Sequence, residues 1–118
     1  MAMPRTVLVA DDSPLVRLTL SRRFKQAGLV VIEAESVRAA TAIDGASVDL
    51  AVLDFDLGDG YGDEIAAHLR VNNATLPIAF FTSSEDGTER TVDYGPLFTK
   101  PAQADEIVAW VISRSTDP

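Results

Sequence analysis

The chain of 118 residues has no cysteine, one histidine and few basic residues, and each shortage excludes a class of function. Without cysteine it cannot form a disulfide framework, a thiolate zinc site or a cysteine nucleophile. With a single imidazole, that of His68, it cannot build a site that needs two. It carries 10 Lys and Arg against 18 Asp and Glu, for a formal net charge of -8. That charge argues against partners such as nucleic acid or an anionic membrane.

The chain also lacks a long apolar run. No segment approaches the roughly 20 apolar residues that a membrane-spanning helix needs. The first residues, MAMPR, contain no apolar segment of the signal-peptide kind, so we expect no signal peptide and a cytoplasmic location. The length suits one domain, because domains cluster at roughly 100–150 residues. We expect that domain to occupy residues 1–118, with a structured core over about 4–114.

Short apolar runs alternate with helical patterns along the chain. Five runs are short and rich in β-branched or aromatic residues, which predicts strands over residues 6–10, 29–32, 50–53, 77–81 and 97–99. Apolar residues at helical spacing predict helices over residues 14–27, 36–43, 63–71 and 103–113. Ser13 followed by Pro14 is typical of a helix N-cap and first helical position, and Gly28 is typical of the end of that helix.

The predicted strands are continuously apolar, as strands are when both faces are buried in a parallel sheet covered by helices. Five such strands alternating with helices predict an α/β fold, a single doubly wound five-stranded parallel sheet with helices on both faces. We expect the flavodoxin-like strand order 2-1-3-4-5. In that order ligands bind at the carboxyl ends of the first and third strands, which is where Asp11, Asp12 and Asp54 lie.

These three carboxylates repel one another, and a hard divalent cation with oxygen ligands relieves such repulsion. We therefore expect Mg²⁺ at this edge of the sheet. A single aspartate at a strand end can simply cap the next helix, which suits Asp11 or Asp12 alone. It does not suit Asp54, because a glycine-rich loop over residues 55–62 follows it rather than a helix start.

Two more predicted strands end in polar side chains, Thr82 after the fourth strand and Lys100 after the fifth. Taken singly, each is an ordinary turn or surface residue. Taken together with Asp54 and a metal, they supply the groups that a phosphoryl-transfer site uses. Phosphoryl transfer depends on positioning and on cations and hydrogen-bond donors around the phosphoryl oxygens. An aspartate can accept the phosphoryl group covalently.

The segments VLVADDSPLVR, AVLDFDLGDGYG, PIAFFTS and LFTKP together resemble a response-regulator receiver domain of two-component signal transduction, over essentially the whole chain. The resemblance implies that Asp54 is the phosphoacceptor. It implies that Asp12 binds Mg²⁺ directly, that Asp11 assists, often through water, and that the backbone carbonyl of Asp56 completes the protein ligands.

The resemblance also implies roles for the two later strand ends. Thr82 hydrogen-bonds the phosphoryl group, Lys100 pairs with a phosphoryl oxygen, and Pro101 follows a peptide bond that is often cis in this family. The implied partners are a sensor histidine kinase or phosphotransfer protein upstream and a protein target downstream. Such a domain is not an enzyme in the usual sense, since it catalyses only its own phosphotransfer and dephosphorylation.

The sequence departs from the family pattern near the fourth helix. Receivers commonly carry Tyr or Phe three residues before the lysine, as a switch coupled to the threonine, whereas this chain has Leu97. Phe98 alternates to the other face of the strand. Thr82 and Lys100 are closer in sequence than usual, and residues 83–95 have no apolar helical stripe. We therefore expect the fourth helix to be short or missing.

The main alternative is an enzyme. The segment Asp54-Phe55-Asp56 after an apolar strand, with Thr82 and Lys100 downstream, also resembles haloacid-dehalogenase phosphatases, in which the first aspartate is the nucleophile and the second the general acid. Against this, the motif lies mid-chain, no acidic pair follows Lys100 on a further strand, and the chain has no room for a substrate cap. The alternative also leaves the aspartate pair after the first strand without a role.

Overall fold

The computed structural model describes residues 3–115 and contains one parallel sheet in the predicted order, β2-β1-β3-β4-β5. Each strand pairs in parallel with its neighbours. The winding reverses between β1 and β3, which places the carboxyl ends of these two strands at the switch point of the fold. The strands are β1 (Thr6–Ala10), β2 (Val30–Ala34), β3 (Leu50–Leu53), β4 (Ile78–Thr82) and β5 (Leu97–Thr99).

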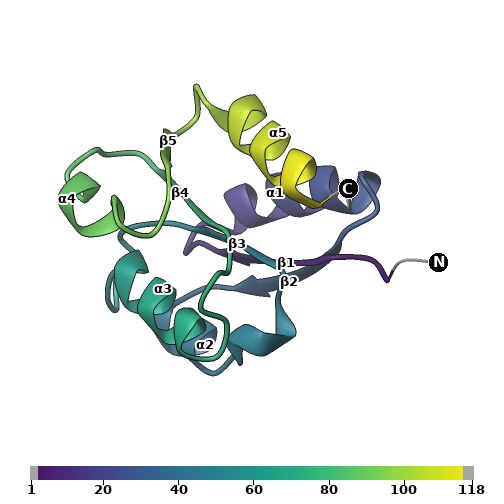
Figure 1. Cartoon of the computed structure of the whole chain (residues 1–118). Coiled ribbons are helices and arrows are strands. Elements are labelled where there is room, and N and C mark those ends of the chain that lie inside the picture. Colours follow the sequence, from purple (N-terminus) through teal and green to yellow (C-terminus); the bar gives the residue numbers. More distant parts are fainter. Residues whose placement is uncertain (1–2, 116–118) are drawn as a thin grey trace.

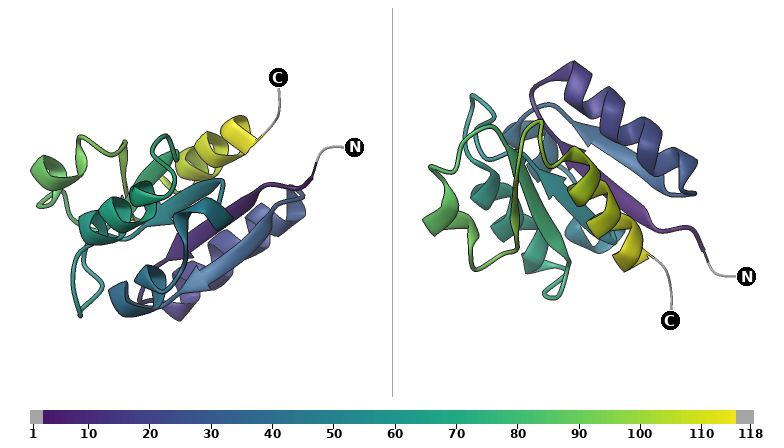
Figure 2. Two further views of the ribbon diagram at one scale, coloured as in Figure 1. Left: turned by 60° about the horizontal axis from the view of Figure 1, so that its bottom comes forward. Right: turned by 90° about the horizontal axis from the view of Figure 1, so that it is seen from above.

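Helices cover both faces of the sheet, as predicted for a doubly wound fold (Figure 1). They are α1 (Pro14–Gln26), α2 (Val37–Thr41), α3 (Gly62–Val71), α4 (Thr88–Thr91) and α5 (Ala104–Ser115), with a short 3-10 helix η1 (Gly45–Ser47). Figure 1 shows α1 and α5 on one face of the sheet and α2 and α3 on the other, and the right view of Figure 2 shows α1 and α5 in front of the sheet with α4 projecting at the side. Among residues 3–115, no helix is both long and apolar enough to span a membrane.

Each face of the sheet has its own apolar core, because alternate residues of a strand point to opposite faces. Along β1, Val7 and Val9 belong to the cluster beneath α1 and α5, whereas Leu8 and Ala10 belong to the cluster beneath α2 and α3. In the cluster beneath α1 and α5, Phe24 is one of the largest side chains and is fully buried. The two-sided burial explains why the strands are continuously apolar in sequence.

The sequence signals at the start and end of α1 are confirmed. Ser13 is the N-cap, its Oγ accepts a hydrogen bond from the Val16 N–H at 3.3 Å, and Pro14 is the first helical residue. After the helix, Gly28 has a φ of 89°, in the left-handed region that favours glycine. The Ser13 cap fixes where the chain leaves β1 and turns into α1, and Gly28 allows the chain to turn after the helix.

Some predicted bounds were wrong by one or two residues. The second strand runs to Ala34 rather than Ile32, because Glu33 pairs with Val9 in the ladder although its side chain is exposed. The apolar run that indicates this edge strand therefore ends before Glu33. The second helix ends at Thr41, short of Ile43, and the 3-10 helix that follows was not predicted.

The fourth helix is short, as predicted, and consists of the four residues Thr88–Thr91. Only Thr91 of these is buried, so the helix has no apolar stripe with which to pack on the sheet. Leu97, at the position where receivers commonly carry an aromatic residue, packs against the cluster beneath α2 and α3, and Phe98 packs against the opposite cluster. The region around α4 thus differs from the family pattern in the way the sequence indicated.

Candidate functional site

A cavity of about 610 Å³ opens at the carboxyl ends of the strands, where the sequence placed the site. Asp54 directly follows β3 and Lys100 directly follows β5. Thr82, expected just after β4, is the last residue of that strand and is 4% exposed. The residues that line the cavity are Asp12, Asp54, Phe55, Asp56, Gly58, Tyr61, Thr82, Ser83, Ser84, Asp86, Arg90 and Lys100.

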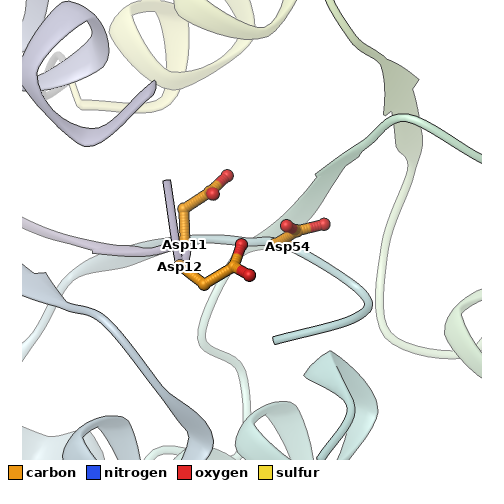
Figure 3. A group of neighbouring side chains, drawn as sticks. All are labelled: Asp11, Asp12 and Asp54. Atoms are coloured by element: carbon orange, nitrogen blue, oxygen red, sulfur yellow. The ribbon is translucent and has the colours of Figure 1, made fainter. Parts of the chain in front are cut away.

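Asp11, Asp12 and Asp54 form one acidic cluster, with a carboxylate oxygen from each lying within 4.8 Å of the others. Figure 3 shows the three side chains extending from neighbouring chain segments into one shared space. Asp11 and Asp54 are buried, whereas Asp12 is exposed toward the cavity. A set of carboxylate oxygens open to water on one side fits Mg²⁺, which takes one or two carboxylates and keeps several waters. The donor set therefore fits the expected cation.

Asp11 is held in place by the start of α1. Its Oδ1 accepts the Ser13 N–H at 2.9 Å, and its backbone carbonyl accepts a hydrogen bond from Arg17 Nη1 at 2.6 Å. Arg17 also pairs with Glu33 on β2, with Nε 3.3 Å from Oε1. Because the N-cap is Ser13, Asp11 forms a turn ahead of α1 rather than capping the helix. Its second oxygen, Oδ2, remains available to the site, where it contacts Lys100.

The Lys100 ammonium connects two of the carboxylates. Its Nζ lies 2.6 Å from Asp11 Oδ2 and 3.1 Å from Asp54 Oδ2. The other oxygen of Asp54 accepts the N–H of Phe55 at 2.7 Å. The Lys100 backbone N–H donates to the Thr82 carbonyl at 2.8 Å, and the Lys100–Pro101 peptide bond is cis. The structure therefore brings Asp54, Thr82 and Lys100 to one edge of the sheet, as the strand pattern predicted.

Burial and the charges of the neighbouring groups shift the pKa values of Asp54 and Lys100. Burial raises the pKa of the Asp54 carboxyl above its ordinary value of 3.8, the charge of Asp11 raises it further, and Lys100 lowers it without outweighing them. Burial alone lowers the pKa of Lys100, but its hydrogen bond to Asp11 and the charge of Asp54 outweigh that effect and raise it above 10.5. A further cation would relieve the cost of keeping Asp54 ionised.

This balance predicts how stability depends on pH. Because the folded-state pKa of Asp54 is raised, ionising its carboxyl destabilises the folded state as pH rises from 3.8 through the raised pKa. We expect Asp54→Asn to raise the melting temperature by a few degrees near pH 7 in the presence of a chelator. The gain should shrink as pH falls and disappear below about 3.8. Thermal melts of both proteins across this range test the prediction, which a pH-independent difference would contradict.

The glycine-rich loop after Asp54 allows α3 to begin directly against the site. A Cβ on Gly62 would lie 2.1 Å from the Asp54 carbonyl oxygen, so only glycine permits this approach. The Gly62 N–H donates to the Phe55 carbonyl at 2.6 Å. Gly58 has a φ of 88° and turns the loop, as its composition predicted.

Sequence reasoning missed a second group of residues at the cavity, around α4. The guanidinium of Arg90 lies over the rings of Tyr61 and Phe55, at 4.6 and 5.3 Å from their centroids. It also pairs with Asp63 on α3, with Nε 3.0 Å from Oδ2. No sequence signal points to these contacts, because Arg90 is distant in sequence from its partners and lies on a segment without periodicity. Only the folded chain brings them to the rim.

With this geometry established, comparison with known proteins identifies the class. The sequence profile of the response regulator receiver domain matches residues 7–112. The chain belongs to that family, the receiver domains of two-component systems. Receiver domains are signalling domains rather than typical enzymes, so the match does not support the alternative of a haloacid-dehalogenase phosphatase.

The curated relatives are longer proteins, and the chain matches only a part of each. The chain is 34% identical over 86 residues to the sensor protein EvgS of Escherichia coli, covering 72% of this chain and 7% of EvgS. It is 31% identical to the phosphate regulon transcriptional regulatory protein PhoB of Pseudomonas aeruginosa, covering 97% of this chain and 54% of PhoB. The chain thus spans about half the length of PhoB and a small part of EvgS.

Solved structures confirm the fold. The chemotaxis protein CheY4 of Vibrio cholerae superposes with a TM-score of 0.83 at 21% identity, covering 97% of this chain and all of that one. The receiver domain of HemR from Leptospira biflexa, in its non-phosphorylated form, superposes with a TM-score of 0.80 at 26% identity, covering 98% of both chains.

Proposed function

We propose that this receiver domain accepts a phosphoryl group on Asp54 from a sensor histidine kinase or phosphotransfer protein and signals by changed contacts with a downstream protein. The observation that carries the proposal is the placement of Asp54 in a cavity where Lys100 contacts its carboxylate at 3.1 Å and two further aspartates lie within 4.8 Å. This arrangement supplies an oxygen nucleophile, a cation and a set of metal ligands at one point.

The proposed metal is Mg²⁺. The carboxylates of Asp11, Asp12 and Asp54 and the backbone carbonyl of Asp56 would hold it, and these oxygens are the hard ligands that it prefers. When bound, it would neutralise negative charge on the carboxylates and on the phosphoryl oxygens. The raised pKa of Asp54 supports this proposal, because burial first and the charge of Asp11 second make the ionised carboxyl costly, and a cation would offset both effects.

In the proposed transfer, a carboxylate oxygen of Asp54 forms a bond to the phosphorus of a phosphohistidine. The phosphorus–nitrogen bond breaks, its electron pair stays on the imidazole nitrogen, and that nitrogen takes a proton from solvent. The ammonium of Lys100 and the hydroxyl of Thr82, both lining the cavity, would pair with the phosphoryl oxygens. Lys100 would then exchange part of its contact with the Asp54 carboxylate for a phosphoryl oxygen.

We place the proposed donor on another protein, because the single imidazole of this chain, that of His68, lies outside the cavity lining. The single imidazole is on α3, and its Nε2 lies 2.7 Å from the Ile43 carbonyl. The names of the relatives, a sensor protein and a transcriptional regulatory protein, are compatible with a kinase upstream and a protein target downstream. A cytoplasmic location stays a prediction.

Phosphotransfer profiling tests the function. We expect the chain, incubated with Mg²⁺ and phosphorylated histidine kinases of its source organism, to become labelled rapidly by one kinase and slowly by the others. With p-nitrophenyl phosphate we expect little or no turnover, because such a domain catalyses only its own phosphotransfer and dephosphorylation. Steady multiple turnover of that substrate, lost on substitution of Asp54, would contradict the proposal in favour of a phosphatase.

A further inference from the structure

Arg90 is one of the two cations among the described residues that line the cavity, together with Lys100. Lys100 is already shared between Asp11 and Asp54, with contacts of 2.6 and 3.1 Å. The Arg90 side chain is 46% exposed and lies at the rim, on the short helix α4. Arg90 is therefore a second cation, beside Lys100, that a new negative charge in the cavity can attract.

One edge of the Arg90 guanidinium is occupied. Nε and Nη2 lie 3.0 and 2.9 Å from the two carboxylate oxygens of Asp63. The rings of Tyr61 and Phe55 support the guanidinium at 4.6 and 5.3 Å. Within residues 3–115, no hydrogen-bond partner is found for Nη1. Its two N–H groups are thus free to donate while the other edge stays on Asp63.

The same contacts tie α4 to the chain segment that follows Asp54. Gly87, just before α4, packs so closely on Phe55 that a Cβ there would lie 2.6 Å from the ring. The Phe55 N–H in turn donates to Asp54 Oδ1 at 2.7 Å. Contacts through Phe55 and Gly87 therefore link Asp54 to α4, the helix that carries Arg90.

We propose that Arg90 binds the phosphoryl group of phosphorylated Asp54 through its Nη1 edge and draws α4 toward the cavity. The proposal rests on the proposed function, because it requires phosphorylation of Asp54. A phosphoryl group adds a charge of about −1.5 to −2 and three acceptor oxygens. The planar guanidinium matches such oxygens better than an ammonium does. Arg90 then connects the site to α4 in a chain where Leu97 lacks the aromatic ring of the usual switch.

Amide hydrogen exchange of α4 tests the proposal, because the Arg90, Thr91 and Val92 N–H groups donate within this helix. Exchange is measured with and without acetyl phosphate and Mg²⁺, and intact mass reports phosphoryl uptake in each sample. We expect phosphorylation to slow these amides about fivefold in the parent chain, the size of one charged hydrogen bond at an exposed rim.

Four variants separate phosphoryl binding from simple anchoring of α4. Arg90→Ala should lose the slowing on phosphorylation, and Arg90→Lys, which keeps the charge without the planar fork, should keep part of it. Asp63→Asn should speed exchange in both states but retain the slowing, because it removes only the anchor. Arg22→Ala, an exposed arginine on α1, is the matched control and should behave like the parent.

Three outcomes would contradict the account, two of them the role of Arg90 and one the proposed function. A parent chain that takes up one phosphoryl group without slower exchange in α4, or an Arg90→Ala variant that shows the same slowing, would overturn the role of Arg90 and leave the phosphoacceptor function standing. A folded parent chain that binds neither a phosphoryl group from acetyl phosphate nor beryllofluoride with Mg²⁺ would overturn the proposed function itself, and this inference with it.

Discussion

An Asp54→Asn variant is expected to take up no phosphoryl group from acetyl phosphate and Mg²⁺, under conditions in which the parent chain takes up one. The amide has nearly the shape of the carboxylate but is a far weaker nucleophile, so the loss is that of an attacking oxygen and not of the fold. The expected rise in melting temperature near pH 7 shows independently that the variant is folded. Intact mass spectrometry measures the uptake.

Asp56→Asn is the matched control for this experiment. Asp56 lines the same cavity, two residues away, but its carboxylate is exposed and accepts the Gly58 N–H at 3.0 Å. Its proposed contribution to the site is a backbone carbonyl, which the substitution leaves in place. We expect this variant to be labelled as the parent is. Uptake by Asp54→Asn equal to that of Asp56→Asn would contradict the assignment of the phosphoacceptor.

Mg²⁺ is expected to stabilise the folded chain, because it relieves the repulsion among three carboxylates within 4.8 Å of one another. A ligand that binds only the folded state at 100 times its Kd adds about 2.7 kcal/mol. For a domain of this size that corresponds to a rise in melting temperature of roughly 10 °C. Thermal melts across a Mg²⁺ titration, starting from chelator, measure the effect.

The Asp12→Ala variant should lose most of this rise. Asp12 is the exposed member of the cluster, so its removal deletes a metal ligand without opening a hole in the core. Asp86→Ala removes an equal charge from the cavity lining outside the cluster and serves as the control. An equal response of all three proteins to Mg²⁺ would show that general charge screening, and not a site at the cluster, causes the stabilisation.

The strand ends were predictable from sequence because they depend on local pattern. Continuous apolar runs indicated buried parallel strands, and the topological switch point then required Asp11 and Asp54 to lie together. The capping pair at residues 13–14 fixed the start of α1 in the same way. Each of these inferences uses residues adjacent in sequence together with one general rule of sheet topology.

The contacts around α4 could not be predicted in this way. The sequence indicated a short fourth helix, and it is short, but nothing local indicates that Arg90 lies over Tyr61 and pairs with Asp63. Such contacts depend on how a segment without its own apolar stripe folds back on a loop. The bounds of β2 were missed for a related reason, since Glu33 is paired by its backbone although its side chain is exposed.

The most direct test of the account is to locate the phosphoryl group. After incubation with acetyl phosphate and Mg²⁺, borohydride reduction converts an aspartyl phosphate to homoserine, which peptide mass spectrometry assigns to one position. The account predicts reduction at Asp54 alone, abolished when Mg²⁺ is chelated before the donor is added. Reduction at Asp12 or Asp56, or phosphate stable to base on a hydroxyl side chain, would contradict it.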